Sequence, residues 1–328
     1  MSTTSLSRSA ALFRAVLLCS ALSACGGGGG DTPAPIDPPA PPPVAAPPTP
    51  APAPALAPFA YLVQADKVEV CEIDSGNLLT NCIDAGVPSE YQEMAAIAVA
   101  GSSAYISNLS AVGTIIHCSI GASGRFSGCA ETGPSGLGSP YGLAVHGSTL
   151  YIGDSGSPRI QKCGIQPNGL LDACTDARFP DALSSAIEDL RIVGTTAYVL
   201  SYNENRVTRC DVLADGSFSN CADANVPGLA SPEGVSISGN YLYVANNSAG
   251  NVVRCLIDET NGSLTDCIDA GASGLGNPTQ VAIRGSSVYI SDSAAAGGVT
   301  RCTVASDGLL TDCVSTPGST LYSIAIRQ

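Results

Sequence analysis

Twelve of the fourteen cysteines in this chain form a strict repeat, and that repeat constrains the fold more than any other feature. They fall into six pairs, with ten residues between the two members of every pair except one, which has eleven. Successive first cysteines are 45 or 47 residues apart, and a period of about 46 residues is what four short strands with their turns require. We therefore expect six copies of one four-stranded unit. The pairs are Cys71/Cys82, Cys118/Cys129, Cys163/Cys174, Cys210/Cys221, Cys255/Cys267 and Cys302/Cys313.

Each cysteine pair encloses a dipeptide that favours a tight turn. Asn-Gly and Asp-Gly are the strongest short-range signals for a β-hairpin, and glycine readily adopts the positive φ that such turns need. The cysteines of a pair should therefore be cross-strand neighbours with Cα atoms ~4.5–5.5 Å apart, which is within disulfide range. Two-residue and four-residue loops stay open for most pairs, and the longer fifth pair fits a three-residue loop. The dipeptides are Gly76-Asn77, Ser123-Gly124, Asn168-Gly169, Asp215-Gly216, Asn261-Gly262 and Asp307-Gly308.

The spacing of these pairs favours disulfides over metal or haem sites. Structural zinc sites use closely spaced ligands in fours, and the chain has only two histidines and no C-x-x-C-H motif. We predict six disulfides, one within each hairpin, and therefore an oxidising compartment outside the cytoplasm. Closing a loop of about a dozen residues stabilises each unit by up to ~3 kcal/mol in the chain-entropy treatment, and keeps the outermost strand paired.

Four strand patterns recur in each unit, and we name them A to D in chain order. Strand A is represented by GLAVHG (142–147) and strand B by TLYIGD (149–154), in which a tyrosine takes the third position. Strands C and D run up to or through the first and second cysteine of a pair. Because β-branched residues and tyrosines alternate with period two and no helical period is sustained, we expect essentially no helix. Residues 181–187 are the one ambiguous run.

The two ends of the repeat region complement each other. It begins with a B strand at residues 59–64 and ends with an A strand at residues 323–328, so the last A strand should complete the first unit. Six helix-free units protect their sheet edges when they pack radially, as in a β-propeller. We therefore predict an all-β, six-bladed β-propeller of four-stranded antiparallel blades, with strand A innermost. One blade should be closed by N-terminal strands B, C and D and the C-terminal strand A.

One segment of the repeat also resembles a known family. Residues 140–161 read PYGLAVHGSTLYIGDSGSPRIQ and resemble an NHL-type propeller repeat, and the resemblance extends over residues 59–328. It implies the propeller fold. It implies no particular activity, because propellers host binding modules and enzymes alike.

The N-terminal 25 residues have the pattern of an export signal. Arg8 and Arg14 precede the apolar run 15–24, which is too short to span a bilayer. Residues 22–25 read LSAC and resemble the bacterial lipobox. This resemblance implies that residues 1–24 are a lipoprotein signal peptide and that Cys25 carries acyl chains such as palmitate. The residue after Cys25 is glycine and not aspartate, which implies sorting to the outer membrane.

Residues 25–57 join this signal to the repeats. They combine the lipidated cysteine with a Gly/Pro/Ala-rich tether, which lacks the residues needed to pack a core and favours an extended chain. The β-propeller domain is therefore expected at residues 58–328. These features predict an outer-membrane lipoprotein of the bacterial cell envelope that faces the periplasm or the cell surface.

The formal net charge of −14 narrows the range of partners. Nucleic acid and anionic lipid surfaces both attract cationic proteins, so we expect no nucleic-acid partner and membrane contact through the lipid anchor alone. We expect a monomer that binds an unidentified protein or small molecule.

Residues at the start of strand A vary between units, and they should ring the mouth of the central channel, where function usually lies. Glu188, Asp189 and Glu233 come from consecutive units and could supply oxygen ligands to Ca²⁺. The alternative is that these carboxylates are solvated loop residues, and that the Asp or Asn ending each B strand caps a turn. Further candidates for ligand binding at the mouth are Tyr141, Asp154, Asn246, Thr279, Asp292 and Tyr322.

Two hypotheses for function follow from these residues. The first is a non-enzymatic module that binds a protein or small ligand with its loop face. The second is a Ca²⁺-dependent hydrolase, because gluconolactonase-family enzymes are six-bladed propellers with acidic and Asn metal ligands in the channel. That resemblance is architectural only, and it assigns no catalytic residue here. No G-x-S-x-G, phosphate-loop or zinc motif occurs in the sequence.

Overall fold

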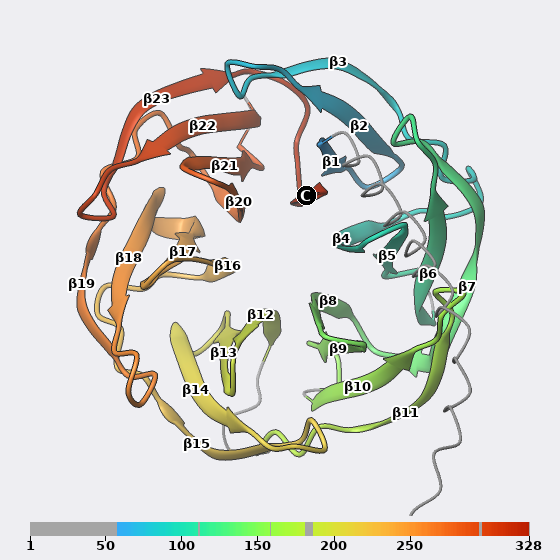
Figure 1. Ribbon diagram of the computed structural model, residues 1–328, viewed down its shortest axis with the longest axis horizontal. Helices are drawn as coiled ribbons and strands as arrows, with labels where there is room; N and C mark the ends of the chain where they lie inside the picture. The colour runs from blue at the N-terminus through green and yellow to red at the C-terminus, as the bar shows by residue number, and fades with distance from the viewer. Residues whose placement is uncertain (1–57, 111, 158, 181–185, 295–296, 328) are drawn as a thin grey trace, which may run out of the picture. The chain divides into compact units, whose positions relative to one another are not determined.

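Six four-stranded antiparallel sheets stand around a central axis like the blades of a propeller (Figure 1). The computed structural model describes residues 58–110, 112–157, 159–180, 186–294 and 297–327, which belong to the compact unit Pro54–Gln328. The predicted signal peptide, the tether with Cys25 and most of the ambiguous run 181–187 lie outside these ranges. Across the described ranges the only helix is a short 3-10 turn, η2 (Asn247–Ala249), and none is long and apolar enough to cross a membrane. The predicted all-β six-bladed propeller is therefore confirmed.

Each blade runs from an innermost strand at the channel to an outermost strand at the rim. Blade 1 consists of β24 (Ser323–Arg327), β1 (Phe59–Val63), β2 (Val68–Ile73) and β3 (Leu79–Asp84). Blade 2 consists of β4 (Met94–Ala100), β5 (Ser103–Asn108), β6 (Gly113–Ile120) and β7 (Phe126–Leu137). Blade 3 consists of β8 (Pro140–His146), β9 (Thr149–Asp154), β10 (Arg159–Ile165) and β11 (Leu171–Asp176).

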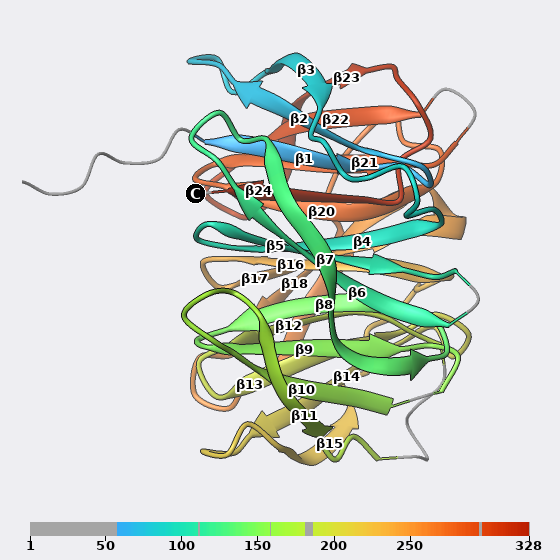
Figure 2. The same cartoon turned by 90° about the vertical axis from the view of Figure 1, so that its right-hand side faces the viewer.

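The remaining blades repeat the same order. Blade 4 consists of β12 (Ile187–Val193), β13 (Thr196–Ser201), β14 (Arg206–Val212) and β15 (Phe218–Asp223). Blade 5 consists of β16 (Pro232–Ser238), β17 (Tyr241–Asn246), β18 (Asn251–Ile257) and β19 (Leu264–Asp269). Blade 6 consists of β20 (Pro278–Arg284), β21 (Ser287–Asp292), β22 (Gly298–Val304) and β23 (Leu310–Thr316). Figure 2 shows the strands running between the two faces of the ring.

The C-terminal strand closes the ring as expected. β24 pairs antiparallel with β1, with Arg327 opposite Phe59 and Ser323 opposite Val63. The hydrophobic core is divided into six clusters, and each is shared by two neighbouring blades. Closing blade 1 therefore also completes the cluster that joins blade 6 to blade 1.

All six predicted disulfides form within their hairpins, which confirms the pairing and indicates an extracytoplasmic, oxidising compartment. Each joins strand C of a blade to strand D. The bonds join Cys71 to Cys82, Cys118 to Cys129, Cys163 to Cys174, Cys210 to Cys221, Cys255 to Cys267, and Cys302 to Cys313.

The two cysteines of a pair differ in burial. The first cysteine of every pair is fully buried in one of the core clusters, as Cys118 is in the cluster shared by blades 1 and 2. The second lies on the outermost strand, where Cys82 is exposed. Each disulfide therefore ties the rim strand of its blade to the core. The remaining second cysteines are half-buried, and they are Cys129, Cys174, Cys221, Cys267 and Cys313.

The Cα atoms of the paired cysteines are 4.0–4.2 Å apart, closer than predicted for a regular cross-strand pair. In blade 1 the ladder shifts register between Val70 and Glu72, and Asn81 before the second cysteine has a φ of 49°. Such a bulge places the second cysteine nearer its partner than an uninterrupted ladder would.

In the five hairpins for which two-residue and four-residue loops were left open, the loop has three residues. In blade 2, the Gly121 N–H donates to the Arg125 carbonyl and the Gly124 N–H donates to the Gly121 carbonyl. This encloses three residues and places Gly124 at a φ of 78°, the pattern of a three-residue loop with a bulge glycine. In blade 5 the extra residue gives a four-residue loop between Asp258 and Ser263, one longer than expected.

The tyrosine in each B strand links its blade to the next. Its hydroxyl donates to a carbonyl in the neighbouring hairpin turn, and Tyr289 to Asn77 makes this bond across the closing seam at 2.9 Å. A Cβ on Gly124 would lie 2.9 Å from the Phe59 ring, so glycine at this position lets the hairpin turn of blade 2 pack closely against blade 1. The other five bonds are Tyr61–Gly124, Tyr105–Gly169, Tyr151–Gly216, Tyr198–Gly262 and Tyr243–Gly308.

Candidate functional site

Most of the innermost strands begin with a β-bulge, at the end that lies at one mouth of the channel. In β12, Ile187 pairs with Ser201 and Asp189 pairs with Leu200, which leaves Glu188 as the extra residue. The extra residue is Tyr141 in β8, Glu233 in β16 and Thr279 in β20. Because a bulge turns its extra side chain away from the regular alternation, these residues are free to face the channel mouth. Sequence comparison between units aligned these positions but carried no signal for the bulge itself.

A cavity of about 320 Å³ occupies this mouth. Its volume lies within the range of pockets that bind small molecules. Three tyrosines and two carboxyl groups contribute to its wall, and no Lys, Arg or His does so among the described residues. The lining residues are Ala95, Ala96, Tyr141, Glu188, Tyr202, Glu233, Thr279, Gln280, Tyr322 and Ser323.

Glu188 and Glu233 are half-buried in the wall of this cavity, and they repel each other. Burial and, to a lesser degree, the charge of the nearby Asp189 carboxyl raise the pKa of Glu188 to about 7. The Ser155 hydroxyl, 3.3 Å from Glu188 Oε1, acts in the opposite direction. Burial and the charge of Glu188 raise the pKa of Glu233 to about 8. Near neutral pH the two carboxyl groups therefore hold protons as an interacting pair.

Tyr141 belongs to the same electrostatic cluster. Burial raises the pKa of its hydroxyl, and the charges of Glu188 and Glu233 raise it further. Tyr322 contributes to the same shift from the C-terminal side of the ring, and its side chain is 44% exposed. The structure thus brings together Tyr141, Glu188, Glu233 and Tyr322 from blades that are distant in sequence.

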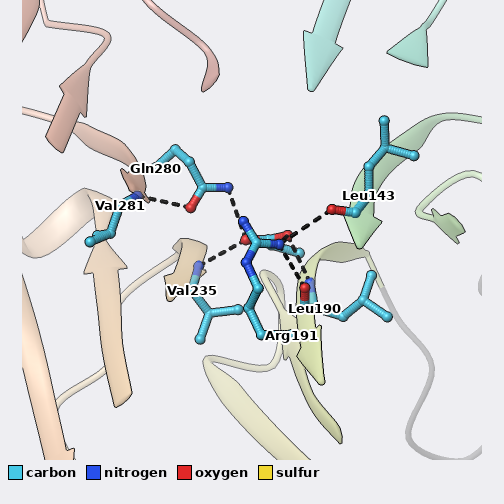
Figure 3. A network of polar contacts seen from close by, with 7 residues as sticks. Leu143, Leu190, Arg191, Val235, Gln280 and Val281 are labelled. Atoms are coloured by element: carbon cyan, nitrogen blue, oxygen red, sulfur yellow. Dashed lines mark hydrogen bonds and ion pairs between the residues drawn. The ribbon is translucent and has the colours of Figure 1, made fainter. Parts of the chain in front are cut away.

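Asp189 is buried, whereas Glu188 is half-buried. The two oxygens of Asp189 accept hydrogen bonds in a polar network, and Figure 3 labels the residues around it. Oδ1 accepts from the Leu190 N–H at 2.8 Å and from Arg191 Nη1 at 2.9 Å. Oδ2 accepts from the Val235 N–H and from Gln280 Nε2, both at 2.9 Å. Burial raises the pKa of Asp189, while Arg191 and the N–H donors act against that rise. Asp189 therefore ties blades 4, 5 and 6 together beneath the mouth.

Glycine at position 234 makes this network possible. A Cβ on Gly234 would lie 2.5 Å from the Thr279 carbonyl oxygen and 2.6 Å from the Gln280 side-chain oxygen. No side chain fits there without displacing the residue that reaches across to Asp189. Arg191 also lines another cavity, together with residues of the innermost strands such as Leu143 and Val281.

Asp154, Asn246 and Asp292 are buried at the ends of their B strands, outside the residues that line the mouth cavity. Each accepts a hydrogen bond from the loop that leads into strand A of its own blade. Asp154 Oδ1 accepts from the Ser139 N–H at 2.7 Å, and Asp292 Oδ2 accepts from the Gly276 N–H at 2.7 Å. Asn246 Oδ1 accepts from the Ala230 N–H at 2.6 Å. These contacts match the alternative in which the side chains hold turns.

The disulfide cysteines lie apart from the mouth, and none of them lines its cavity. Their second members are on the outermost strands, whereas the mouth is built from the starts of the innermost ones. Their role is therefore structural, with no part in the chemistry of the mouth. This holds for Cys129, Cys174, Cys221, Cys267 and Cys313 as for Cys82, which instead borders a cavity at the rim between blades 6 and 1.

The donor set at the mouth fits Ca²⁺ poorly. Ca²⁺ takes six to eight oxygen ligands, and both oxygens of Asp189 already accept hydrogen bonds from nitrogen donors. Glu188 and Glu233 are left as the carboxyl groups on the cavity wall. Across the described part of the chain, no three or more His, Cys, Asp and Glu side chains are placed to hold a metal ion together.

No family model and no curated protein matches the chain. A chain of a nidogen/laminin complex is 18% identical, covering 83% of this chain and 98% of its own, with a TM-score of 0.65. A Bacteroides fragilis protein named "putative 6-phosphogluconolactonase" is 13% identical over 85% of this chain and 100% of its own, with a TM-score of 0.59. A periplasmic gluconolactonase of Pseudomonas aeruginosa is 13% identical over 80% and 84%, with a TM-score of 0.55. At these identities the likeness shows the fold alone.

Proposed function

We propose that the protein is an extracytoplasmic binding module that holds a small organic cation in the mouth cavity. One observation carries the proposal: Glu188 and Glu233 share a cavity of about 320 Å³ with three tyrosines, and no basic side chain of the described residues lies on its wall. A substituted ammonium group can pair with the carboxylates and lie against tyrosine rings, an attraction of about 0.5–2 kcal/mol per ring. Among the described residues that line the cavity, none offers a positive group to an anionic ligand.

The protons on the two carboxyl groups supply a signature for this function. Burial and the charge of Asp189 keep the pKa of Glu188 at about 7, and burial and the charge of Glu188 keep that of Glu233 at about 8. A bound cation favours the ionised carboxylates and so releases protons. Affinity for a permanent cation should therefore increase as pH rises through this interval, and the number of protons released should fall above it.

Calorimetric titration with choline tests the proposal. The matched probe is the uncharged analogue in which carbon replaces the quaternary nitrogen. We expect choline to bind at least about ten-fold more tightly than the analogue, and Glu233→Gln to remove most of that difference. Glu259→Gln, an exposed carboxyl in the blade 5 hairpin turn, is the control and should change nothing. Equal binding of both probes, or no binding of either, would contradict the proposal.

Lactone hydrolysis is the second candidate, and the gluconolactonases that share this fold favour it. A carboxylate whose pKa lies near neutral pH, as at Glu188, is suited to accept a proton from a water molecule that attacks an ester carbonyl. Hydrolysis of gluconolactone above the spontaneous rate, lost in Glu188→Gln and kept in Glu259→Gln, would support this candidate. Hydrolysis at the spontaneous rate in every variant would remove it.

For the cell, we propose that the propeller is a monomeric lipoprotein tethered through residues 25–57 to the outer membrane. The support is the lipobox-like LSAC ending at Cys25 and the glycine after it. The blades are assigned to the NHL type on residues 140–161. Membrane fractionation of a bacterial host expressing the full chain tests the anchor. The wild type should remain with the outer membrane and Cys25→Ser should not, whereas equal partitioning would refute it.

A further inference from the structure

A second cavity, of about 160 Å³, lies at the seam where blade 6 meets blade 1. Its wall is mainly apolar and comes from both sides of the seam. Leu62, Leu79 and Leu321 belong to blade 1 and the loop before β24, while Val299 and Pro317 belong to blade 6 and the loop that leaves it. An apolar cavity of about 150 Å³ in another protein is large enough to bind benzene. This seam cavity therefore has room for a ring-sized molecule.

Gln64 lines this cavity and is only 8% exposed, yet its Nε2 has no acceptor among the described residues. It follows β1 at the place where Asp154 and Asp292 hold the loops of blades 3 and 6. The corresponding loop before β24 is bound elsewhere, because the Leu321 N–H donates to the Asp292 carbonyl. A buried N–H without an acceptor is unfavourable, so a ligand that brings an acceptor to this amide group gains a hydrogen bond.

Arg301 makes the seam differ from the junctions that follow blades 3, 4 and 5. In those blades the basic residue before the first cysteine of strand C reaches the next hairpin turn, as Arg209 does with the Asn261 carbonyl at 2.6 Å. Arg301 instead donates to Ser287 Oγ at 3.3 Å. Its buried Nε, like that of Arg209, has no acceptor among the described residues, and Arg301 lines the same cavity as Gln64. The polar side chains of Glu69, Thr316 and Ser319 also border this cavity, whose wall is mainly apolar. The Gln64 amide is therefore the buried, unpartnered donor that a ligand in the seam cavity could use.

We infer that the seam cavity is a second ligand site, which takes a compact apolar molecule with one carbonyl oxygen, such as a cyclic ketone or lactone. The ring of the ligand contacts the leucines and Val299, and its oxygen accepts from Gln64 Nε2. Because the wall joins the first and last blades, a ligand bound here stabilises the closed ring, and the stabilisation grows with the logarithm of the ligand concentration above its Kd. This site is separate from the mouth cavity, and no residue lines both.

Cyclohexanone and methylenecyclohexane form the matched pair of probes, since a methylene group replaces the oxygen in the second. Methyl NMR of the wild-type protein should show cyclohexanone shifting the signals of Leu62 and Val299 at the seam. We expect about ten-fold weaker binding of methylenecyclohexane, which corresponds to one lost hydrogen bond. Shifts confined to the mouth, or equal affinities for the two probes, would overturn the inference.

Two substitutions separate the role of the amide from a general loss of structure. Gln64→Leu keeps the approximate size of the side chain, and it should erase the preference for cyclohexanone while methylenecyclohexane still binds. Gln166→Leu, at an exposed hairpin turn, should leave the preference unchanged. A high-resolution crystal structure soaked in cyclohexanone completes the test. Density for ordered water alone on Gln64 Nε2 would show that the site is only hydrated and would refute it.

Discussion

Replacing Glu233 with glutamine is expected to stabilise the folded protein in alkaline solution and to change little in acid. Burial and the charge of Glu188 raise the folded-state pKa of Glu233 to about 8, against an ordinary value of 4.5. The folded state therefore binds more protons than the unfolded state across this interval. The contribution to stability is complete below pH 4.5 and is lost as pH rises through about 8.

The size of the effect follows from this interval. The pKa of Glu233 rises from 4.5 to about 8, and each pKa unit corresponds to about 1.36 kcal/mol, so the shift can change the free energy of unfolding by at most about 5 kcal/mol. Water can enter the mouth cavity and solvate the ionised group, so we expect about 2 kcal/mol of this penalty at about pH 9. For a domain of this size, the Glu233→Gln variant should then melt about 4–8 °C above the wild type. Near pH 4.5 both chains carry a largely neutral side chain at position 233, and their melting temperatures should coincide.

Thermal unfolding of the wild type, Glu233→Gln and Glu259→Gln over about pH 4.5 to 9 measures this difference. The exposed Glu259 controls for the change in net charge, since its removal relieves only general repulsion. The reasoning is refuted if the wild-type and Glu233→Gln melting temperatures stay parallel over the whole range. It is also refuted if both glutamine variants gain equally at high pH.

Three further substitutions test the site and the ring. Glu188→Gln should lower the pKa of Glu233, since it removes a charge that raises it, and NMR titration of the Glu233 carboxyl carbon would show this. Gly234→Ala should destabilise the fold by about 1–3 kcal/mol in urea unfolding, because its Cβ meets the backbone of Gln280 at 2.6 Å. Tyr289→Phe should cost about 1 kcal/mol by the same assay, since it deletes a bond across the closing seam; no loss would show that this bond is not stabilising.

Much of the fold could be predicted because the features that encode it are local and repeated. A cysteine pair around a turn dipeptide specifies a hairpin without knowledge of the rest of the chain. The B strand at residues 59–64 and the A strand at residues 323–328 sufficed to predict how the ring closes, and β24 does pair with β1. The three-residue loop at Gly124 was missed because its bulge depends on packing against Phe59 in the preceding blade.

The candidate site was only partly predictable, because its chemistry depends on depth within the channel. Glu188 and Asp189 are adjacent in sequence, yet one lines the mouth cavity and the other is enclosed by four nitrogen donors. The bulge at Glu188 makes the two side chains point in different directions, and no pattern in the sequence predicts this bulge. Gln64 was read only as the last residue of a B strand, and its unpartnered amide became visible only with the seam in place.

The central claim is that Glu188 and Glu233 form an interacting pair of carboxyl groups that hold protons near neutral pH. A small organic cation that binds beside them should cause them to release these protons. The most direct measurement is an NMR pH titration of the Glu233 carboxyl carbon, with and without saturating choline. We expect a pKa of about 8 in the free protein and a clear decrease when choline is bound. A value near 4.5 in the free protein, or one that choline does not move, would contradict the account.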